Sequence, residues 1–265
     1  MINLRYANIN SKLKGMHARF LSKEDLYQLS KQKNLKNAVY FLKNELDVLK
    51  NIDENADRLM IEKELDRIII NDINKIKRLL NNKEQEIFEK FISKYEINRI
   101  TEVYKYIRYF KSLFLSVKTS GKDLTNLIGE KIDLLNIEWI YRMKKYYKLP
   151  EEKIRNNLID VQYKIRKKEI KELINAKDFE EMKKIIKSTE YAKIMENIDE
   201  TNLEHEIDKY FFRKCKKEFE IAKYNLNTVF CYMFLQEFQK KNLINILGGI
   251  SYGLGQKEIE NKIIT

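Results

Sequence analysis

The chain has 265 residues, of which 52 are Lys or Arg and 40 are Asp or Glu, so its formal net charge is +12. Seven glycines and one proline are too few for collagen-like, Gly/Ser-linker or Pro-rich chains, and they argue against sheet folds that need many tight turns. Because 43% of the residues are hydrophobic, the chain can bury a core. We therefore expect an all-α protein with a basic surface suited to acidic partners.

The N-terminal part of the chain carries the signals of consecutive helices. Ser22 and Asp25 have the spacing of a capping box and predict that a helix begins there. Asn34 is a favourable N-cap for the next helix. From that point, apolar residues follow the i, i+3, i+4, i+7 pattern of one helical face: Leu35, Ala38, Val39, Leu42, Leu46 and Leu49.

Fewer start and stop signals occur in the rest of the chain. Pro150 is followed by two acidic residues, which predicts the start of a helix. Gly248 and Gly249 predict the end of the last long helix. Weak apolar patterns predict loops in three segments: 51–57, 116–127 and 188–202.

The cysteines and the apolar runs indicate in which compartment of the cell the protein resides. Two cysteines, Cys215 and Cys231, are too few for a disulfide framework, which fits a reducing compartment. The most apolar run, residues 229–235, is far shorter than the roughly 20 residues of a membrane-spanning helix. The first residues lack the apolar stretch of a signal peptide. We expect a cytoplasmic protein.

The sequence contains internal repeats. Five short segments recur as similar residues in the same order, each 142 to 144 residues downstream: 25–29, 33–35, 41–43, 62–66 and 96–100. We therefore expect residues 21–110 and 165–250 to be diverged copies of one helical unit, within a single all-helical domain of residues 1–265.

The last recurring segment occurs a third time, at 133–137, which predicts a reduced middle copy at 111–148. Taken alone, this third match has an equally good explanation in chance, because the chain is rich in Lys, Asn and Ile. The two longer copies on either side favour the repeat.

The recurring segment places polar side chains on the last helix of each copy. Asp133 and Asn136 are three residues apart, so they share a helical face. As a repeated feature, such a stripe would line a shared interior or a docking surface, whereas each residue alone is more simply a helix contact or a solvent-facing group. We predict partner contacts for Glu96, Arg99, Asp133, Asn136, Gln239 and Asn242.

Several stretches resemble a known family. Residues 234–249 read FLQEFQKKNLINILGG, residues 130–137 read EKIDLLNI, and Tyr6-Ala7-Asn8 is followed by the segment 21–26. With residues 254–259, these stretches resemble the final helix, the middle copy and the opening of the C subunits of V/A-type ATPases, a family whose members are also called d subunits. The final helix of that family carries the motif acid-x-x-Asn-Leu-x-x-Ile-Leu, followed by Gly.

The chain departs from the family pattern in two residues and in length. Gln239 stands where the family has an acid, and Arg99 takes the place of an Asn. The chain is also shorter than typical members, and the loss is concentrated in the middle copy. The shorter middle copy predicts a reduced middle lobe.

The resemblance implies a fold and a role. The fold would be a pseudo-threefold funnel of helical-bundle units with a reduced middle unit. The role would be that of a non-catalytic coupling subunit, peripheral to the cytoplasmic face of the membrane. It would link the central shaft, made of the D and F subunits, to the membrane rotor ring of proteolipid subunits, with a further contact to the membrane stator subunit, for proton or sodium-ion transport.

Neither an active site nor a metal site is indicated by the sequence. His17 and His205 are far apart, and no spacing of His and Cys matches a zinc site. No nucleophile motif is found. We expect no catalytic residues, no cofactor and no bound metal.

A basic all-helical nucleic-acid-binding module is the alternative function. Tyrosines cluster with basic residues at 104–111 and 141–147, and such clusters can stack bases and contact phosphates. Packing of these rings in amphipathic helices is the simpler explanation. Acidic residues interrupt the basic runs, so we expect no nucleic-acid partner.

Overall fold

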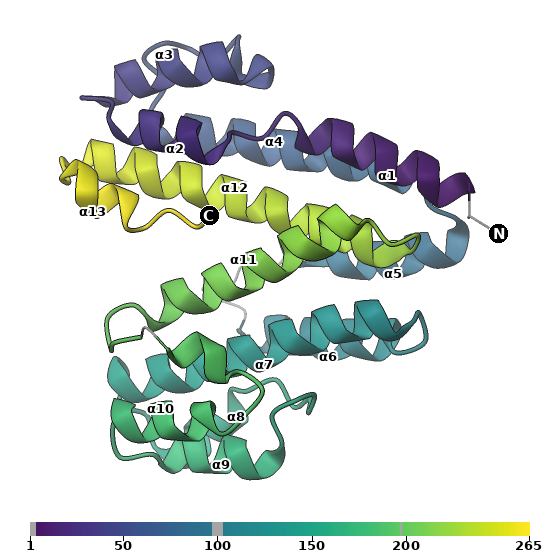
Figure 1. Cartoon of the computed structure of the whole chain (residues 1–265), viewed down its shortest axis with the longest axis vertical. Coiled ribbons are helices and arrows are strands. Elements are labelled where there is room, and N and C mark those ends of the chain that lie inside the picture. Colours follow the sequence, from purple (N-terminus) through teal and green to yellow (C-terminus); the bar gives the residue numbers. More distant parts are fainter. Residues whose placement is uncertain (1–3, 97–102, 197) are drawn as a thin grey trace. The chain divides into compact units, whose positions relative to one another are not determined.

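A computed structural model of the chain describes residues 4–96, 103–196 and 198–265, which hold α-helices, short 3-10 helices and no β-strand (Figure 1). The expected all-α class is therefore confirmed for these residues. The chain forms two compact units. The first unit comprises Met1–Leu80 and Phe212–Thr265, and the second unit comprises Asn81–Phe211.

The first unit is built around its longest helix, α12 (Leu226–Ser251), which packs against helices from both ends of the chain. Its partners are α1 (Leu4–His17), α2 (Lys23–Ser30), α3 (Leu35–Glu45), α4 (Arg58–Lys77) and α13 (Gln256–Glu260). The 3-10 helix η1 (Asp47–Leu49) follows α3. Every residue of the run 229–235 is buried, as expected for a helix that is apolar all round.

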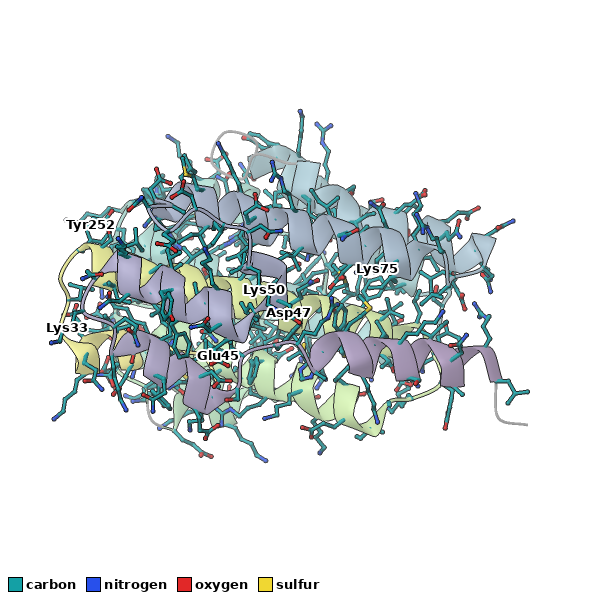
Figure 2. All side chains as sticks on the ribbon, turned by 90° about the horizontal axis from the view of Figure 1, so that it is seen from above. Lys33, Glu45, Asp47, Lys50, Lys75 and Tyr252 are labelled. Atoms are coloured by element: carbon teal, nitrogen blue, oxygen red, sulfur yellow. The ribbon has the colours of Figure 1, made fainter. Side chains whose placement is uncertain are left out.

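Charged side chains cover the outside of the first unit. Asp47 and Lys50, labelled in Figure 2, form an ion pair in which both side chains are exposed. Exposed pairs contribute little because water already solvates both charges. The stability of this unit therefore comes mainly from its core.

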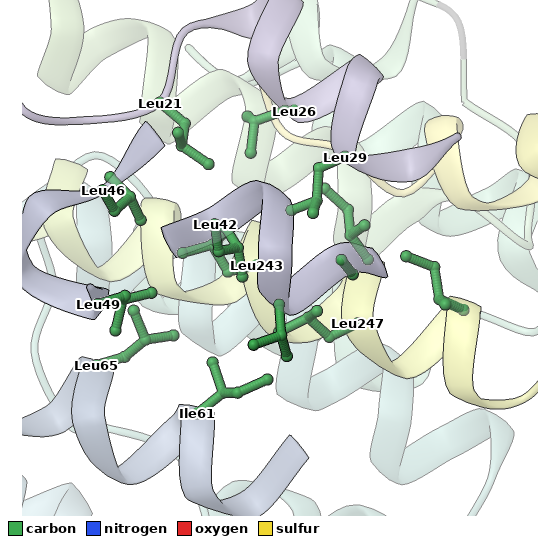
Figure 3. Packing of buried hydrophobic residues seen from close by; sticks show 14 of the residues in the cluster. Leu21, Leu26, Leu29, Leu42, Leu46, Leu49, Ile61, Leu65, Leu243 and Leu247 are labelled. Atoms are coloured by element: carbon green, nitrogen blue, oxygen red, sulfur yellow. The ribbon is translucent and has the colours of Figure 1, made fainter. Parts of the chain in front are cut away.

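The core of the first unit joins the N-terminal helices to α12. Leu42 of α3 and Leu65 of α4 pack with Leu243 and Leu247 of α12 in one apolar cluster (Figure 3). Leu42, at 1% exposure, lies on the apolar face predicted from the sequence. This face extends past the end of α3, because Leu46 and Leu49 are also buried.

The second unit is built around α7 (Lys122–Lys145), which packs against α6, α8 and α9. Its helices are α5 (Asn82–Ile92), η2 (Ser93–Glu96), α6 (Val103–Val117), α7, α8 (Glu151–Asn156), α9 (Lys167–Asn175), α10 (Phe179–Lys187) and η3 (Ala192–Met195). The helix α11 (Leu203–Ile221) begins in the second unit and ends in the first.

The predicted helix starts are confirmed. The Ser22 and Asp25 side chains each bond the backbone N–H of the other residue, at 3.1 and 2.8 Å. Asn34 accepts from the N–H of Asn37 at 2.9 Å. Helix α8 begins directly after Pro150.

Similar caps occur 144 residues downstream. The N–H of Arg166 bonds to Glu169 at the start of α9, and Asp178 caps α10 by accepting from Glu181. The order of a capped helix, a second capped helix and a 3-10 helix is thus the same in the two places. The compact units do not follow the limits of the predicted copies, and the copies at 21–110, 111–148 and 165–250 stay a prediction.

The predicted helix end at Gly248 and Gly249 is wrong. Helix α12 continues to Ser251, and the chain turns at Gly253, where φ is 68°. A Cβ atom on Gly249 would lie 2.6 Å from Cγ1 of Ile259. This glycine therefore permits the close approach of α13, which lies beyond the reach of a local pattern.

The predicted loops have mixed outcomes. No helix covers 51–57, as expected, and the described residues of 188–202 hold only the short η3. The loop at 116–127 is shorter than predicted, because α6 ends at Val117 and α7 begins at Lys122. Within the described residues, every helix is too short or too polar to cross a membrane.

Leu42→Ala should destabilise the chain by about 2–5 kcal/mol, because it removes buried methyl groups and leaves a cavity under α3. Leu59→Ala is the matched control, since Leu59 is 58% exposed on α4, and it should change the free energy of unfolding by less than about 1 kcal/mol. Urea unfolding followed by circular dichroism measures both variants. Equal losses would show that the cluster in Figure 3 does not carry the stability.

Candidate functional site

The structure describes five of the six residues of the predicted stripe. Asp133 and Asn136 lie on α7 in the second unit, and Gln239 and Asn242 lie on α12 in the first unit. Glu96 is the last residue of η2, and Arg99 lies outside the described residues.

The two asparagines make the same contact in their two units. Asn136 donates its amide Nδ2 to the carbonyl of Ile159 at 3.0 Å and accepts the N–H of Ile159 at 2.9 Å. Asn242 makes both bonds to Ile264, each at 2.8 Å. We call each of these pairs of hydrogen bonds an asparagine clamp.

The clamp follows from the chemistry of an amide. An asparagine side chain holds a donor and an acceptor side by side, as a peptide group does, so it can bond both backbone groups of one residue. Both asparagines and both isoleucines are at most 3% exposed. Buried backbone groups need partners, so each clamp fixes an irregular chain segment against the long helix of its unit.

Asp133 holds the chain segment that follows the clamp in the second unit. Its Oδ2 atom accepts from the N–H groups of Lys164 at 2.8 Å and Ile165 at 3.2 Å, and from the Tyr191 hydroxyl at 2.9 Å. Burial raises the pKa of Asp133 to about 6, although these three hydrogen bonds act in the opposite direction. Burial and the neighbouring Asp133 also raise the pKa of Tyr191.

A second carboxylate, Glu130, lies one turn before Asp133 on α7. Its partner Lys164 bonds to Glu130 at 2.8 Å and to Glu190 at 2.9 Å. Burial lowers the pKa of Lys164, but the two carboxylates outweigh it and the pKa rises. Lys164 thus stays charged at neutral pH and ties its own segment to α7 through both its backbone and its side chain.

Gly129 completes this contact by making room for it. A Cβ atom on Gly129 would lie 2.4 Å from Cγ of the Tyr163 ring, so the ring lies directly on the helix backbone. The Tyr163 hydroxyl bonds to Asn126 one turn earlier. Residues 159–165, which we call the strap, therefore lie along α7 from Asn136 to Asn126.

The first unit holds a different buried carboxylate, Asp72 of α4. Tyr232 and Gln236 of α12 donate to its Oδ2 atom at 2.7 and 2.9 Å. Arg19 bonds to the other oxygen, Oδ1, at 3.4 Å. This network joins α4 to α12, and burial beside Asp72 raises the pKa of Tyr232.

Sequence reasoning missed Asp72, Lys164 and Tyr191. Asp72 could have been found from the sequence, because this residue interrupts a helical face of isoleucines on α4 that includes Ile69, Ile73 and Ile76. No local pattern in the sequence pointed to Lys164 or Tyr191, because Asp133, which both residues bond, lies more than 30 positions away in the chain.

The two tyrosine clusters do not form uniform exposed faces. Three of their tyrosines are buried: Tyr106, Tyr109 and Tyr141. Three others are more than half exposed: Tyr104, Tyr146 and Tyr147. The packing explanation therefore holds for the buried rings, and Tyr109 also donates to the carbonyl of Phe91 at 2.9 Å.

The buried polar residues described above hold irregular chain segments and helices in place. Its carboxylates are buried and occupied by hydrogen bonds from N–H groups, hydroxyls and cations of their own unit. Among the described residues, no three His, Cys, Asp or Glu side chains are grouped so as to hold a metal ion.

Comparisons with known proteins point to a family. A family model described as ATP synthase (C/AC39) subunit matches residues 9–105 and 100–262. The C subunit of the A-type ATP synthase of Methanosphaera stadtmanae is 26% identical over 147 residues, which cover 51% of this chain. The match spans 38% of the length of that relative.

Asn136→Ala should lower the free energy of unfolding by about 2–5 kcal/mol, because it leaves the N–H and C=O of Ile159 buried without partners. Asn156→Ala is the control, since Asn156 is exposed at the end of α8, and its effect should stay within about 0.5 kcal/mol. Urea unfolding of both variants measures the difference. A loss as small in Asn136→Ala as in the control would show that the clamp does not hold the strap.

Asp133 should make stability depend on pH in an unusual direction for an acid. Because its pKa rises from 3.8 to about 6 on folding, the folded chain binds the proton more tightly than the unfolded chain does. The free energy of unfolding should therefore fall as pH rises from about 4 to about 6, by an amount on the order of 3 kcal/mol, and level off above that.

Asp133→Asn tests this because it removes the titrating proton but keeps the shape and one acceptor oxygen. Urea unfolding at about pH 4.5 and about pH 7.5 should give a smaller difference in the variant than in the natural chain. The same pH dependence in both chains would contradict the assignment to Asp133.

Proposed function

The chain belongs to the ATP synthase (C/AC39) subunit family, and on this premise we propose that it is the non-catalytic coupling subunit of a rotary V/A-type ATPase. It would link the central shaft, made of the D and F subunits, to the membrane rotor ring of proteolipid subunits at the cytoplasmic face. Torque from ATP hydrolysis would then pass through the chain to drive proton or sodium-ion transport.

One observation carries this proposal. The family model matches two segments that together run from residue 9 to residue 262, so the likeness is not confined to one motif. The all-helical structure is compatible with it. The named relative from Methanosphaera stadtmanae supports the same family over a shorter stretch.

The pseudo-threefold funnel belongs to the proposal as well. Its support is the order of capped helices that recurs in α2–α3 and α9–α10, and the asparagine clamp that recurs on α7 and α12. The funnel would receive the tip of the shaft, and its outer face would contact the ring and the membrane stator subunit.

The residues that contact partners remain a proposal of their own. Glu96 and Arg99 stay candidates, and Gln239 is half-buried beside an open pocket. Asp133, Asn136 and Asn242 are buried and bonded within their units. Reversing the charge of Asp133 would therefore report on folding rather than on docking.

Reconstitution tests the proposal directly. Vesicles carrying the ring, the stator, the shaft and the ATPase head should accumulate ions on addition of ATP only when this chain is present. The isolated chain should show no ATP hydrolysis, because its proposed role is mechanical. Affinity purification of the tagged chain should recover the proteins of the shaft and the ring.

Two outcomes would contradict the proposal. One is ion accumulation that is the same without the chain. The other is a tagged chain that recovers nucleic acid, bound with the steep salt dependence of phosphate contacts, but neither shaft nor ring.

A further inference from the structure

Half of the net positive charge of the chain lies in two short segments of the first unit. Residues 4–17, which form α1, carry three basic residues and no acidic one. Residues 213–224, at the end of α11 and in the turn after it, carry five basic residues and two acidic ones. Together they supply half of the charge of +12. Such a concentration of one sign of charge favours a negatively charged partner.

The two segments are in contact with each other. Asn10 donates its amide to the carbonyl of Ala222 at 2.9 Å, and the rings of His17 and Phe219 lie 4.9 Å apart. Lys14 is one turn from both Asn10 and His17, so it lies on the side of α1 that faces α11. The two segments therefore form one continuous surface, which we call the basic face.

Several cations of the basic face have no partner of opposite charge. Lys12, Lys14 and Lys217 are exposed, and within the described part of the chain they form no ion pair. The two acidic residues lie next to other lysines: Glu218 pairs with Lys223 at 3.4 Å, and Glu220 and Lys216 both lie beside His17. The remaining ammonium groups are therefore available to an external anionic surface.

The turn after α11 adds two exposed apolar side chains to the basic face. Ile221 is 55% exposed and Tyr224 is 53% exposed. Lys217 precedes Ile221 by one helical turn, so the two side chains are neighbours on α11. The turn has a fixed backbone, because the Thr228 hydroxyl bonds to the carbonyl of Lys223 at 2.7 Å and Asn10 holds the preceding carbonyl. Exposed apolar groups on a fixed turn beside lysines indicate a contact surface.

We propose that the basic face binds the surface of a lipid bilayer that contains anionic lipids. Its lysines would pair with the phosphate and carboxylate groups of the lipid heads, and Ile221 would enter the boundary between the heads and the acyl chains. The Tyr224 ring would lie among the heads, where tyrosine is enriched in membrane proteins. This goes beyond the coupling role, which requires contacts with proteins only.

A nucleic acid fits the basic face less well than a bilayer does. It would pair with the lysines but leave Ile221 in water, because binding to nucleic acids depends on phosphate contacts and on the stacking of bases on aromatic rings. A bilayer accommodates the charged and the apolar side chains together.

Sedimentation with lipid vesicles tests the proposal on the full chain. The vesicles contain either phosphatidylcholine alone or phosphatidylcholine with phosphatidylserine, and neither kind contains protein. We expect the chain to sediment with the anionic vesicles only. Added salt should release it, because ions screen the attraction between exposed charges.

Two pairs of lysines separate the basic face from the overall charge. Lys14→Gln with Lys217→Gln should weaken vesicle binding about 25-fold, since each lysine near an anionic membrane contributes about fivefold. Lys33→Gln with Lys36→Gln is the matched control, because it removes the same charge from exposed sites around the start of α3. Lys33 lies at the far end of the first unit from the start of α1 (Figure 2), so the control should change binding less than about twofold.

Two isoleucines of equal exposure separate the apolar contact from the charge. Ile221→Gln should weaken binding to the anionic vesicles about tenfold, because the inserted side chain no longer removes apolar surface from water. Ile70→Gln is the control, since Ile70 of α4 is also 55% exposed but lies outside the basic face, and it should leave binding unchanged.

Fluorescence shows whether the turn enters the bilayer. The chain has one tryptophan, Trp139 of the second unit, so Tyr224→Trp adds a single new fluorophore. On anionic vesicles its emission should shift to shorter wavelength and be quenched by brominated acyl chains. Tyr252→Trp should show neither change, because Tyr252 is 76% exposed after the end of α12 and outside the basic face.

Four results would overturn the proposal. The chain might fail to bind anionic vesicles, or the two lysine pairs might weaken binding equally, which would assign it to the overall charge. The emission of Tyr224→Trp might stay unchanged on vesicles that bind the chain. Lastly, a DNA duplex might bind where vesicles do not, with the loss caused by Lys14→Gln and Lys217→Gln, which would assign the basic face to nucleic acid. These readouts use no ring, shaft or ATP, so they are independent of the test of the coupling role.

Discussion

The organisation of both units depends on a buried asparagine that replaces a missing peptide partner. Asn136 and Asn242 each satisfy the N–H and C=O of a residue 22 or 23 positions further along the chain. An irregular segment could not otherwise lie against a buried helix without leaving backbone groups unpaired. The long apolar helix can thus be covered by non-helical chain as well as by other helices.

Both units share the asparagine clamp, but they use their buried carboxylates differently. The second unit uses Asp133 to collect backbone N–H groups and a tyrosine, so its carboxylate fixes the strap. The first unit uses Asp72 to join two helices through Tyr232 and Gln236. Buried carboxylates thus join a helix to a helix in the first unit and a helix to irregular chain in the second unit.

The sequence predicted best what is decided within a few residues. Ser22, Asn34 and Pro150 mark helix starts because a cap bonds a neighbour three residues away or fixes the local backbone. Gly249 was misread because its reason lies in Ile259, across a turn. The repeat search located the asparagines, but what they bind lies more than 20 residues on, so the stripe was interpreted as a partner surface.

Each clamp bonds only the main chain of its target, which has a consequence for how such a protein can diverge. Any residue except proline offers the same N–H and C=O at positions 159 and 264, so substitutions there leave both hydrogen bonds intact. The asparagine, by contrast, has no equal substitute, since few side chains hold a donor and an acceptor in that arrangement. Copies built on this device can drift far apart in sequence and keep their register through a single side chain each.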